Sequence, residues 1–248
     1  MRRLLPEPAG EVDDAELERL YDYPQSLAAP WVQVNFVSST DGSASVQGRS
    51  DGLSSPADKK IFALARDLAD VILVGAGTAQ IEGYRGVKRT EVRAERRARL
   101  GRAELPPIAV VTRRCSIGPD SVLITDTVIA PIVLTCAAAP EDRRAALRSA
   151  GADVVVVGDT TVDLAHAISA LAERGLTRIN CEGGPQLFGE LIATDLVDQL
   201  CLTVTPLLVG GDASRIAHGQ LPPAPQHREL ASVLTEDDFL MLRYRRAG

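Results

Sequence analysis

Aromatic residues and excess positive charge are both scarce in this chain of 248 residues. Phe, Trp and Tyr make up only 4% of it, and 27 Lys and Arg stand against 33 Asp and Glu, which gives a net charge of −6. Nucleic-acid binding usually needs a basic face, and the binding of single strands uses aromatic rings on which bases stack. We therefore expect no nucleic-acid partner.

Metal-ligand spacing is also missing. No C-x-x-C pair occurs, and the three histidines are scattered. Cysteines at such distances indicate neither a zinc site nor a disulfide framework, and free thiols fit a reducing compartment. We expect no bound metal and a cytoplasmic location. The four separate cysteines are Cys115, Cys136, Cys181 and Cys201.

Long apolar runs are absent as well. No window approaches the roughly 18 apolar residues that a membrane-spanning helix needs. With 45% hydrophobic and 24% charged residues, the composition is typical of a globular protein that buries a substantial core. We expect no membrane segment.

A strand-turn-helix segment near residue 180 carries the strongest local signal that is present. Residues 178–181 are typical of a short buried strand, and residues 185–192 have the apolar spacing of a helix that begins at a proline. Glu182, Gly183 and Gly184 form the turn. Glycines let a ligand approach the backbone, and a helix N-terminus attracts anions, so the turn is a candidate phosphate site. Taken alone, a tight turn without a ligand explains it at least as well.

Two further polar corners follow runs typical of buried strands. The first is Gly75–Thr78, and the second begins with Thr112 and Arg113. The dinucleotide fingerprint is incomplete, because Gln80 stands where its third glycine belongs. The carboxyl ends of neighbouring parallel strands share one edge of a sheet, so the three corners are expected to converge on a phosphorylated ligand. Each corner is also compatible with a plain turn or a solvated arginine.

The order of the patterns predicts an α/β fold. Strand and helix patterns alternate along most of the chain, which indicates a mainly parallel sheet. The strand patterns at 199–205 and 240–245 have no helix between them, which predicts an antiparallel C-terminal edge. Residues 1–30 indicate an N-terminal arm, and residues 31–248 a single domain. The charged run 88–105 is typical of a solvated helix face.

A set of motifs, taken in order along residues 31–245, resembles one known family. The motifs are S-S-T-D-G at 38–42, S-D-G-L-S-S-P at 50–56, V-I-L-V-G-A-G-T at 71–78, I-N-C-E-G-G-P-Q-L at 179–187, and L-V-D-Q-L at 196–200 with T-P-L-L-V-G-G at 205–211. They are similar to the reductase domain of the bifunctional riboflavin-biosynthesis deaminase-reductase; the deaminase zinc motif is not found. The resemblance implies a dihydrofolate-reductase-like fold with helices on both faces of the sheet, and a homodimer. It also implies NADPH as hydride donor to a ribosylated aminopyrimidine, whose ring-opened ribose becomes a ribityl chain.

Candidate site residues come from the strand ends and from the resemblance. The strand ends predict a cofactor site at Gly75, Gly77, Thr112, Arg113 and Gly183, with Arg113 suited to the 2′-phosphate of NADPH. The positions that the resemblance assigns to the cofactor are Val37, Thr78, Glu82, Gly184, Pro185, Gln186 and Leu187. Those that it assigns to the substrate are Ser50, Arg66 and Glu182. Glu182 and Asp41 are the candidate catalytic carboxylates, although a turn cap explains Asp41 better.

The chain departs from the family pattern at two places. Asn35 stands where the family usually has a substrate-contacting lysine, and residues 81–89 replace the usual D-D-P-x-L-T-x-R run. Arg85, Lys88 or Arg89 would then supply the missing cation to the substrate beside Asn35, or the pocket accepts a neutral heterocycle. Two alternatives stay open: a dihydrofolate or pterin reductase on the same scaffold, and a module that binds NADPH without turnover.

Overall fold

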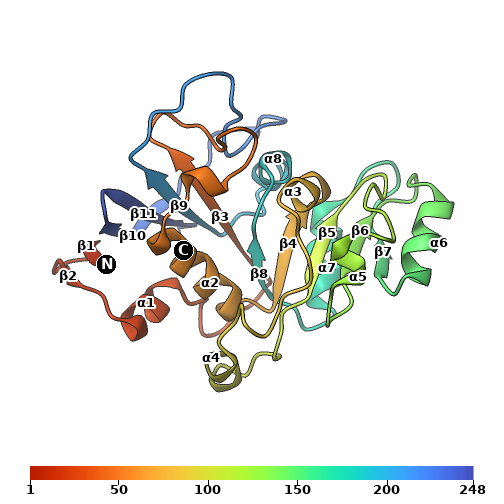
Figure 1. The fold of residues 1–248 in the computed structure, drawn as a ribbon, viewed down its shortest axis with the longest axis horizontal. Coiled ribbons are helices and arrows are strands. Elements are labelled where there is room, and N and C mark those ends of the chain that lie inside the picture. The colour runs from red at the N-terminus through yellow and green to blue at the C-terminus, as the bar shows by residue number, and fades with distance from the viewer. Residues whose placement is uncertain (248) are drawn as a thin grey trace.

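The strands pair into one sheet of eleven strands within residues 1–247, the part of the chain that this computed structural model describes (Figure 1). Their order across the sheet is β2-β1-β10-β11-β9-β3-β8-β4-β5-β6-β7. The strands are β1 (Arg2–Leu5), β2 (Gly10–Glu11), β3 (Trp31–Ser39), β4 (Val71–Gly75), β5 (Ile108–Val111), β6 (Ile132–Thr135), β7 (Asp153–Val156), β8 (Arg178–Cys181), β9 (Gln199–Thr205), β10 (Glu229–Glu236) and β11 (Phe239–Arg245).

The middle of the sheet is parallel. β3 pairs in parallel with β8 on one side and β9 on the other, and the parallel pairing continues from β8 through β4, β5, β6 and β7. β9, β11 and β10 pair antiparallel. The predicted parallel sheet with an antiparallel C-terminal edge is confirmed. The carboxyl ends of β3, β8, β4 and β5 therefore lie at one edge.

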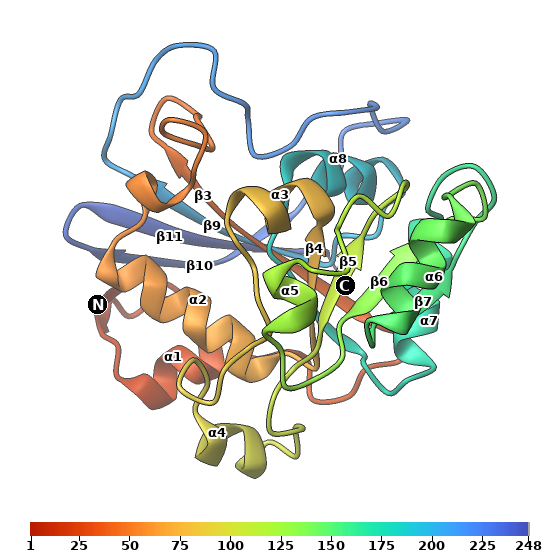
Figure 2. The ribbon, with the colours of Figure 1, turned by 45° about the vertical axis from the view of Figure 1, so that its right-hand side comes forward.

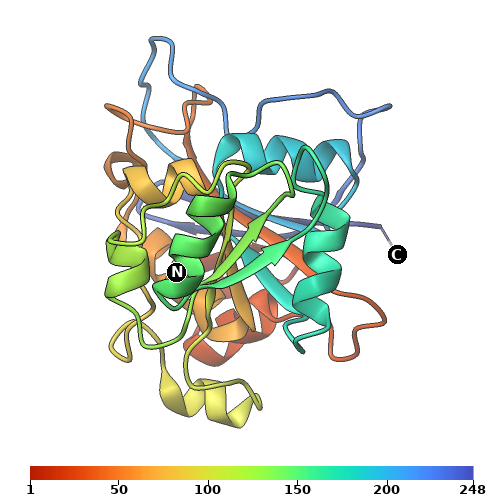
Figure 3. The same cartoon turned by 90° about the vertical axis from the view of Figure 1, so that its right-hand side faces the viewer.

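Helices cover both faces of the sheet. α7 and α8 pack on one face, where Leu171 and Leu191 are fully buried, and α3, α5 and α6 pack on the other around Leu147. Figure 3 shows α6 in green and α7 in teal on opposite sides of the strands. α1 and α2 pack against the antiparallel strands. The helices are α1 (Asp14–Tyr21), α2 (Pro56–Leu68), α3 (Ala76–Ile81), α4 (Ala94–Arg99), α5 (Val122–Thr125), α6 (Glu141–Ser149), α7 (Leu164–Ala172) and α8 (Pro185–Ala193), with a 3₁₀ turn at Asp51–Leu53.

Local sequence rules explain where α2 begins. The Ser55 hydroxyl accepts a hydrogen bond from the Asp58 N–H at 3.1 Å, and Pro56 occupies the first helical position. Ile61 and Leu64 are buried in the core, so α2 lies firmly against the sheet. With these residues buried, a different face of α2 points toward the edge of the sheet where the parallel strands end.

The N-terminal residues extend the sheet. β1 pairs antiparallel with β10, and Leu17 and Tyr21 of α1 are buried in the cluster that includes α2. β10 has no counterpart among the strands predicted from the sequence. Its apolar residues occur in two adjacent pairs and do not alternate with polar ones, and its first two residues are exposed, so its periodicity is weak.

The charged run 88–105 differs from the expected solvated helix. α4 is short, and Arg97 within it is fully buried, with 0% of its surface exposed. Its guanidinium donates to the carbonyl oxygens of Asp67 and Ala69, at 3.0 and 2.8 Å, at the end of α2. The last carbonyls of a helix lack intrahelical partners and attract cations. Arg97 therefore closes the C-terminus of α2, a contact that a charge pattern does not reveal.

Within residues 1–247, no helix has the length and apolar character to cross a membrane. The four cysteines are free and buried. Burial raises the pKa of the Cys181 thiol to about 12 and that of Cys201 to about 11. Both thiols are therefore protonated at neutral pH and act as small apolar groups.

Candidate active site

The ends of β4, β8 and β5 lie at the same carboxyl edge of the sheet, and hydrogen bonds link the corners that follow them. The Gly75 N–H donates to the Gly183 carbonyl oxygen at 2.8 Å, which joins the ends of β4 and β8. The Gln80 side-chain amide donates to the Ser116 carbonyl oxygen at 3.0 Å and ties α3 to the loop after β5. The corners thus form one continuous surface.

Packing requires glycine at the β8 corner. Gly183 has a φ of 95°, a left-handed conformation that side chains disfavour. A Cβ on Gly184 would lie 2.1 Å from the Thr78 hydroxyl oxygen. The two glycines are therefore explained without a phosphate. Their close contact with Thr78 still brings two predicted cofactor positions together.

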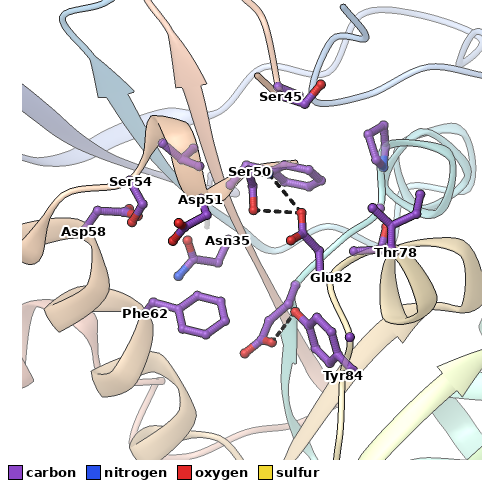
Figure 4. A pocket seen from close by; sticks show the side chains of 18 of the residues that line it. Asn35, Ser45, Ser50, Asp51, Ser54, Asp58, Phe62, Thr78, Glu82 and Tyr84 are labelled. Carbon is purple, nitrogen blue, oxygen red and sulfur yellow. Dashed lines mark hydrogen bonds between the residues drawn. The ribbon is translucent and has the colours of Figure 1, made fainter. Parts of the chain in front are cut away.

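A cavity of about 550 Å³ opens at this edge (Figure 4). Small-molecule pockets typically span about 300 to 1,000 Å³. The walls come from β3, the loop before α2, α2 itself, α3 with the segment after it, and the β8–α8 corner. The lining includes Asn35, Phe36, Val37, Ser50, Asp51, Ser54, Asp58, Lys59, Phe62, Arg66, Thr78, Glu82, Tyr84, Arg85, Glu91, Glu182, Gly184 and Pro185.

Glu182 is fully enclosed at the base of the cavity, with 0% of its side chain exposed. Arg66 donates from Nε and from one terminal nitrogen to its two oxygens, each at 2.8 Å. The Tyr84 hydroxyl donates at 2.7 Å, and the Asn180 amide donates at 3.0 Å. Four donors therefore satisfy this carboxylate. Glu182 anchors Arg66 and Tyr84 in the wall.

The charge states of this cluster follow from burial and proximity. Burial lowers the pKa of Arg66, but the adjacent Glu182 charge outweighs that effect, and the pKa is raised. Burial of the hydroxyl, and next the Glu182 charge, raise the pKa of Tyr84 well above its ordinary value of 10.0. Arg66 is therefore a permanent cation and Tyr84 a permanent hydrogen-bond donor at neutral pH.

One side of α2 lines the cavity. Asp58, Phe62 and Arg66 are spaced four residues apart and so share a helix face. The Arg66 guanidinium lies 4.6 Å from the centroid of the Phe62 ring and 5.7 Å from that of Tyr84, which is cation–π geometry. Its remaining terminal nitrogen lies 3.3 Å from Glu91. Two carboxylates and two aromatic rings therefore fix the position of the Arg66 guanidinium.

Glu82 and Ser50, which the resemblance assigns to cofactor and substrate, contact each other. The Ser50 N–H and hydroxyl donate to one Glu82 oxygen at 2.9 and 3.0 Å (Figure 4). Arg49 lies 3.8 Å from the other oxygen. This contact joins the loop before α2 to the end of α3.

The structure brings nine of the predicted site residues into the cavity wall. They are Asn35, Val37, Ser50, Arg66, Thr78, Glu82, Glu182, Gly184 and Pro185. Five others adjoin the wall at the β4 and β8 corners. They are Gly75, Gly77, Gly183, Gln186 and Leu187. Thr112 and Arg113 lie at the end of β5, outside the wall.

Asp41 does not line the cavity. Its carboxylate accepts hydrogen bonds from the Ser39 hydroxyl, from the Gly210 N–H at 2.7 Å and from the Val209 N–H at 3.1 Å. The Ser39 bond and then the backbone bonds lower the pKa of Asp41. Asp41 therefore ties the loop after β9 to the end of β3, which corresponds to its turn-capping alternative.

Of the three candidate replacement cations, only Arg85 lines the cavity, 3.7 Å from Glu91. Arg89 lies 2.6 Å from Glu104, and Lys88 pairs with Asp126. These two side chains make ion pairs elsewhere on the surface. Arg89 was predicted to contact the substrate, but its side chain does not line the cavity.

The start of α8 fits the diphosphate of a dinucleotide such as NADPH. The hydrogen bonds of the helix begin at Phe188, whose N–H donates to the Gly184 carbonyl oxygen at 2.9 Å. The N–H groups of Gln186 and Leu187 have no backbone acceptor within residues 1–247 and can donate to an anion. Figure 2 shows the segment between β9 and β10 passing above α8, where the His218 N–H donates to the Pro185 carbonyl oxygen at 3.2 Å.

Sequence reasoning missed several wall residues. The four-residue spacing of Asp58, Phe62 and Arg66 after a well-marked helix start is a signal that would have found one face. Tyr84 and Glu91 have no local signal. Their contacts with Glu182 and Arg66 join residues 98 and 25 positions apart in the chain.

Comparison with known proteins identifies a relative that shares most of the chain. The 2,5-diamino-6-ribosylamino-4(3H)-pyrimidinone 5′-phosphate reductase of Archaeoglobus fulgidus is 31% identical over 194 residues, which are 77% of this chain and 87% of that protein.

Solved structures share the fold. A pyrimidine reductase-like protein from Corynebacterium diphtheriae superimposes with a TM-score of 0.76 and 26% identity, over 88% of this chain and 92% of the other. A diaminohydroxyphosphoribosylaminopyrimidine deaminase/5-amino-6-(5-phosphoribosylamino)uracil reductase from Thermotoga maritima superimposes with a TM-score of 0.65 and 18% identity, over 88% of this chain and 57% of the other. Residues 30–240 match the family described as the RibD C-terminal domain. The chain belongs to the RibD C-terminal domain family of reductases.

Proposed function

We propose that this protein is an NADPH-dependent reductase of riboflavin biosynthesis that converts the ribosylamino group of a pyrimidine 5′-phosphate to a ribitylamino group. The observation that carries the proposal is the single cavity whose wall combines residues assigned to the cofactor with residues assigned to the substrate. Kinship with a reductase of that activity supports it. Bound NADPH supplies the hydride, and the chain's own residues position the reactants.

The cofactor side of the proposal is the edge from α8 to β5. The N–H groups at the start of α8 hold the diphosphate, and Thr78 with Gly184 borders the nicotinamide. Arg113, which is exposed at the end of β5, meets the 2′-phosphate. Val37 and Glu82 complete the cofactor wall.

The substrate side is the wall from β3 to α2. The pyrimidine lies against Asn35, Ser50 and Arg66. Glu182 acts by holding Arg66 in place, because its two oxygens already accept four hydrogen bonds. Lys59, with 63% of its side chain exposed, and Arg85, with 56%, stand at the mouth and suit a 5′-phosphate.

A dihydrofolate or pterin reductase is the second candidate. The observation that favours it is the charge of the wall, where carboxylates outnumber cations and Asn35 replaces a lysine. A net negative wall suits an uncharged ring better than a phosphate. The carboxylates are Asp51, Asp58, Glu82, Glu91 and Glu182, and the cations are Lys59, Arg66 and Arg85.

We further propose a cytoplasmic homodimer in which residues 1–30 form an arm on the reductase domain that begins at residue 31. Along β9 buried and half-exposed residues alternate, and Leu202 and Leu242 lie on the half-exposed side, away from α2. Such an apolar sheet face suits a twofold contact with a second copy. Sedimentation equilibrium tests this, since a monomer at micromolar concentration contradicts it.

Steady-state turnover tests the function. NADPH is supplied with the ribosylaminopyrimidine 5′-phosphate and, in a separate assay, with dihydrofolate. The proposal predicts pyrimidine reduction with kcat/KM of at least about 10⁴ M⁻¹s⁻¹. A preference for dihydrofolate selects the second candidate. NADPH binding without oxidation by either compound selects the non-catalytic module and contradicts both enzymes.

A further inference from the structure

The segment between β9 and β10 has no regular structure, but it is attached at two places beside the cavity. Residues 206–208 and 210–215 are exposed, and Ser214 also lines the cavity. We call residues 206–218 the strap. Figure 2 shows this part of the chain leaving the end of β9 and passing above α8. None of the site residues predicted from the sequence lies in it.

The first attachment of the strap lies at the end of β3. The Ala44 N–H donates to the Ser214 carbonyl oxygen at 2.8 Å, and both residues line the cavity. The loop that carries Ala44 folds back on β3, since the Ser39 N–H donates to the Ser43 carbonyl oxygen at 2.9 Å. Val37, which the resemblance assigns to the cofactor, lies two residues before Ser39 on β3. Ser214 is therefore held on the cofactor side of the cavity.

The second attachment lies on the first two turns of α8. The His218 N–H donates to the Pro185 carbonyl oxygen at 3.2 Å, and a Cβ on Gly189 would lie only 2.0 Å from the His218 carbonyl oxygen. Ile216 and Ala217 pack against the hydrophobic cluster that includes the buried side of α8. The strap backbone therefore lies directly on the helix, and only a residue without a side chain at position 189 allows this contact.

The two attachments are close together along the chain. Residues 214–218 span at most about 18 Å, so the strap crosses directly from the end of β3 to the start of α8. Gly184 and Pro185 line the cavity at this helix start, and the N–H groups of Gln186 and Leu187 follow them. A diphosphate bound at those N–H groups would lie beside the strap.

The Ser214 side chain has hydrogen-bonding capacity left for such a ligand. Its carbonyl oxygen is used by Ala44, but its hydroxyl has no partner within residues 1–247. A hydroxyl can donate to a phosphate oxygen or accept from a ribose hydroxyl. Figure 4 shows Ser45, which follows Ala44, on the side of the cavity that holds Thr78 and away from Asp58 of α2. The free hydroxyl is therefore carried by the part of the wall assigned to the cofactor.

We propose that Ser214 is a further cofactor-binding residue and that Gly189 is its positioning residue. The Ser214 hydroxyl contacts the ribose-diphosphate part of NADPH, and the strap retains the nucleotide while it lies on α8. This inference rests on the proposed function and adds residues to its cofactor site. Few contacts hold the exposed strap, so it opens more easily than the sheet beneath it, and bound NADPH favours the closed state. Release of the nucleotide then requires the strap to lift.

Two variants separate the hydroxyl from the attachment that positions it. Ser214→Ala keeps the bond to Ala44, which uses backbone atoms, and should raise the Kd for NADPH about three- to tenfold, the range of one hydrogen bond. Gly189→Ala favours the helix but displaces the strap, so NADPH should dissociate about tenfold faster in stopped-flow fluorescence. Gly10→Ala is the control, because nothing lies within 4 Å of its Cβ position, and it should change neither value. Wild-type values in Ser214→Ala or in Gly189→Ala overturn the inference.

Limited proteolysis tests the strap in the unmodified protein. Arg215 is exposed between the two attachments, so trypsin can cut after it when the strap lifts. NADPH at about ten times its Kd should slow this cut about tenfold, because only the closed state binds the nucleotide. The cut after Arg174, in the exposed turn before β8 at the opposite edge of the sheet, should keep its rate. Equal protection at both places would show general stabilisation, and no protection at Arg215 would show no contact; either result contradicts the proposal.

Turnover separates this inference from the proposed function. If NADPH protects the strap and Ser214→Ala weakens its binding, but no pyrimidine is reduced, the strap assignment stands and the proposed reaction fails. If the pyrimidine is reduced and the KM for NADPH is the same in the wild type and both variants, the reaction stands and the strap assignment fails. The KM for the pyrimidine should stay within about twofold in both variants, and a rise in that KM alone would contradict an assignment to the cofactor.

Discussion

Arg66 and Glu182 form a two-point ion pair, with two guanidinium nitrogens each 2.8 Å from a carboxylate oxygen. The pair joins α2 to the end of β8 across 116 residues of chain, and its side chains are 14% and 0% exposed. Because the geometry is planar and enclosed, it fixes the separation of helix and strand at the base of the cavity. The stability of the fold and the shape of the site therefore depend on the same contact.

Breaking this pair from one side is expected to be costly. Arg66→Met leaves the Glu182 charge buried without its cation, and the expected loss in unfolding free energy is about 3 to 5 kcal/mol. In urea unfolding, Arg66→Met combined with Glu182→Gln should lose less than the sum of the single variants, by about 1 to 3 kcal/mol. Additive losses would show that the two groups act independently. Lys59→Met is the control, because the exposed pair with Asp51 is worth about 0 to 1 kcal/mol.

Alkaline pH is expected to destabilise the protein through its buried phenols. Burial raises the pKa of Tyr21, Tyr23 and Tyr84 well above 10.0 in the folded state. The unfolded phenols ionise near their ordinary value, so stability is complete below about pH 10 and falls as the pH rises further, by about 1.4 kcal/mol per pH unit for each tyrosine. Tyr84→Phe should make this slope shallower by one tyrosine. An identical slope in the variant would contradict the burial of that hydroxyl.

Arg113 is expected to distinguish NADPH from NADH. Calorimetric titration of Arg113→Ala should show NADPH affinity reduced by about tenfold or more, the range of one lost charge-assisted contact. NADH affinity should change by less than about twofold, since NADH carries no 2′-phosphate. Arg114→Ala is the matched neighbour and should leave both affinities unchanged. Equal losses for both nucleotides in Arg113→Ala would remove its assigned role.

A side chain at Gly183 is expected to lower the stability of the fold. With φ at 95° and a Cβ position 3.0 Å from the Phe36 ring, Gly183→Ala should cost about 1 to 3 kcal/mol of unfolding free energy. Gly77→Ala is the contrast, because Gly77 lies in α3 with nothing within 4 Å of its Cβ position. Alanine there should leave stability equal or raise it by up to about 1 kcal/mol. Thermal unfolding that ranks the two variants in the opposite order would contradict the packing of this corner.

The sequence predicts the framework of this protein well. Buried strands such as β4 and helix starts such as Ser55 carry local signals, because a β-branched run and a capping hydroxyl act within a few residues. The same locality predicts that the three corners converge, since neighbouring parallel strands end at one edge. β10 escaped prediction because its pairing with β1 and β11 stabilises it more than its own pattern does.

The walls of the site were less predictable. Arg97 and Tyr84 lie in charged or irregular stretches, and only tertiary contacts bury them. Asp41 carried a local turn signal, and its carboxylate caps a turn. Arg89 was expected to contact the substrate, but its side chain forms an ion pair with Glu104. The residue type at a strand end shows which interactions its side chain can make. The residue with which it interacts lies in a distant segment of the chain, so a local pattern does not reveal it.

The most direct test of the central claim is the transfer of deuterium from NADPH that carries deuterium at both positions of nicotinamide C4. The protein is incubated with this NADPH and the 2,5-diamino-6-ribosylaminopyrimidinone 5′-phosphate, and mass spectrometry follows the pyrimidine. The account predicts a ribitylamino product that carries one deuterium on the former C1′ of ribose. Recovery of unreduced pyrimidine beside intact deuterated NADPH, from protein shown to be folded, would contradict it.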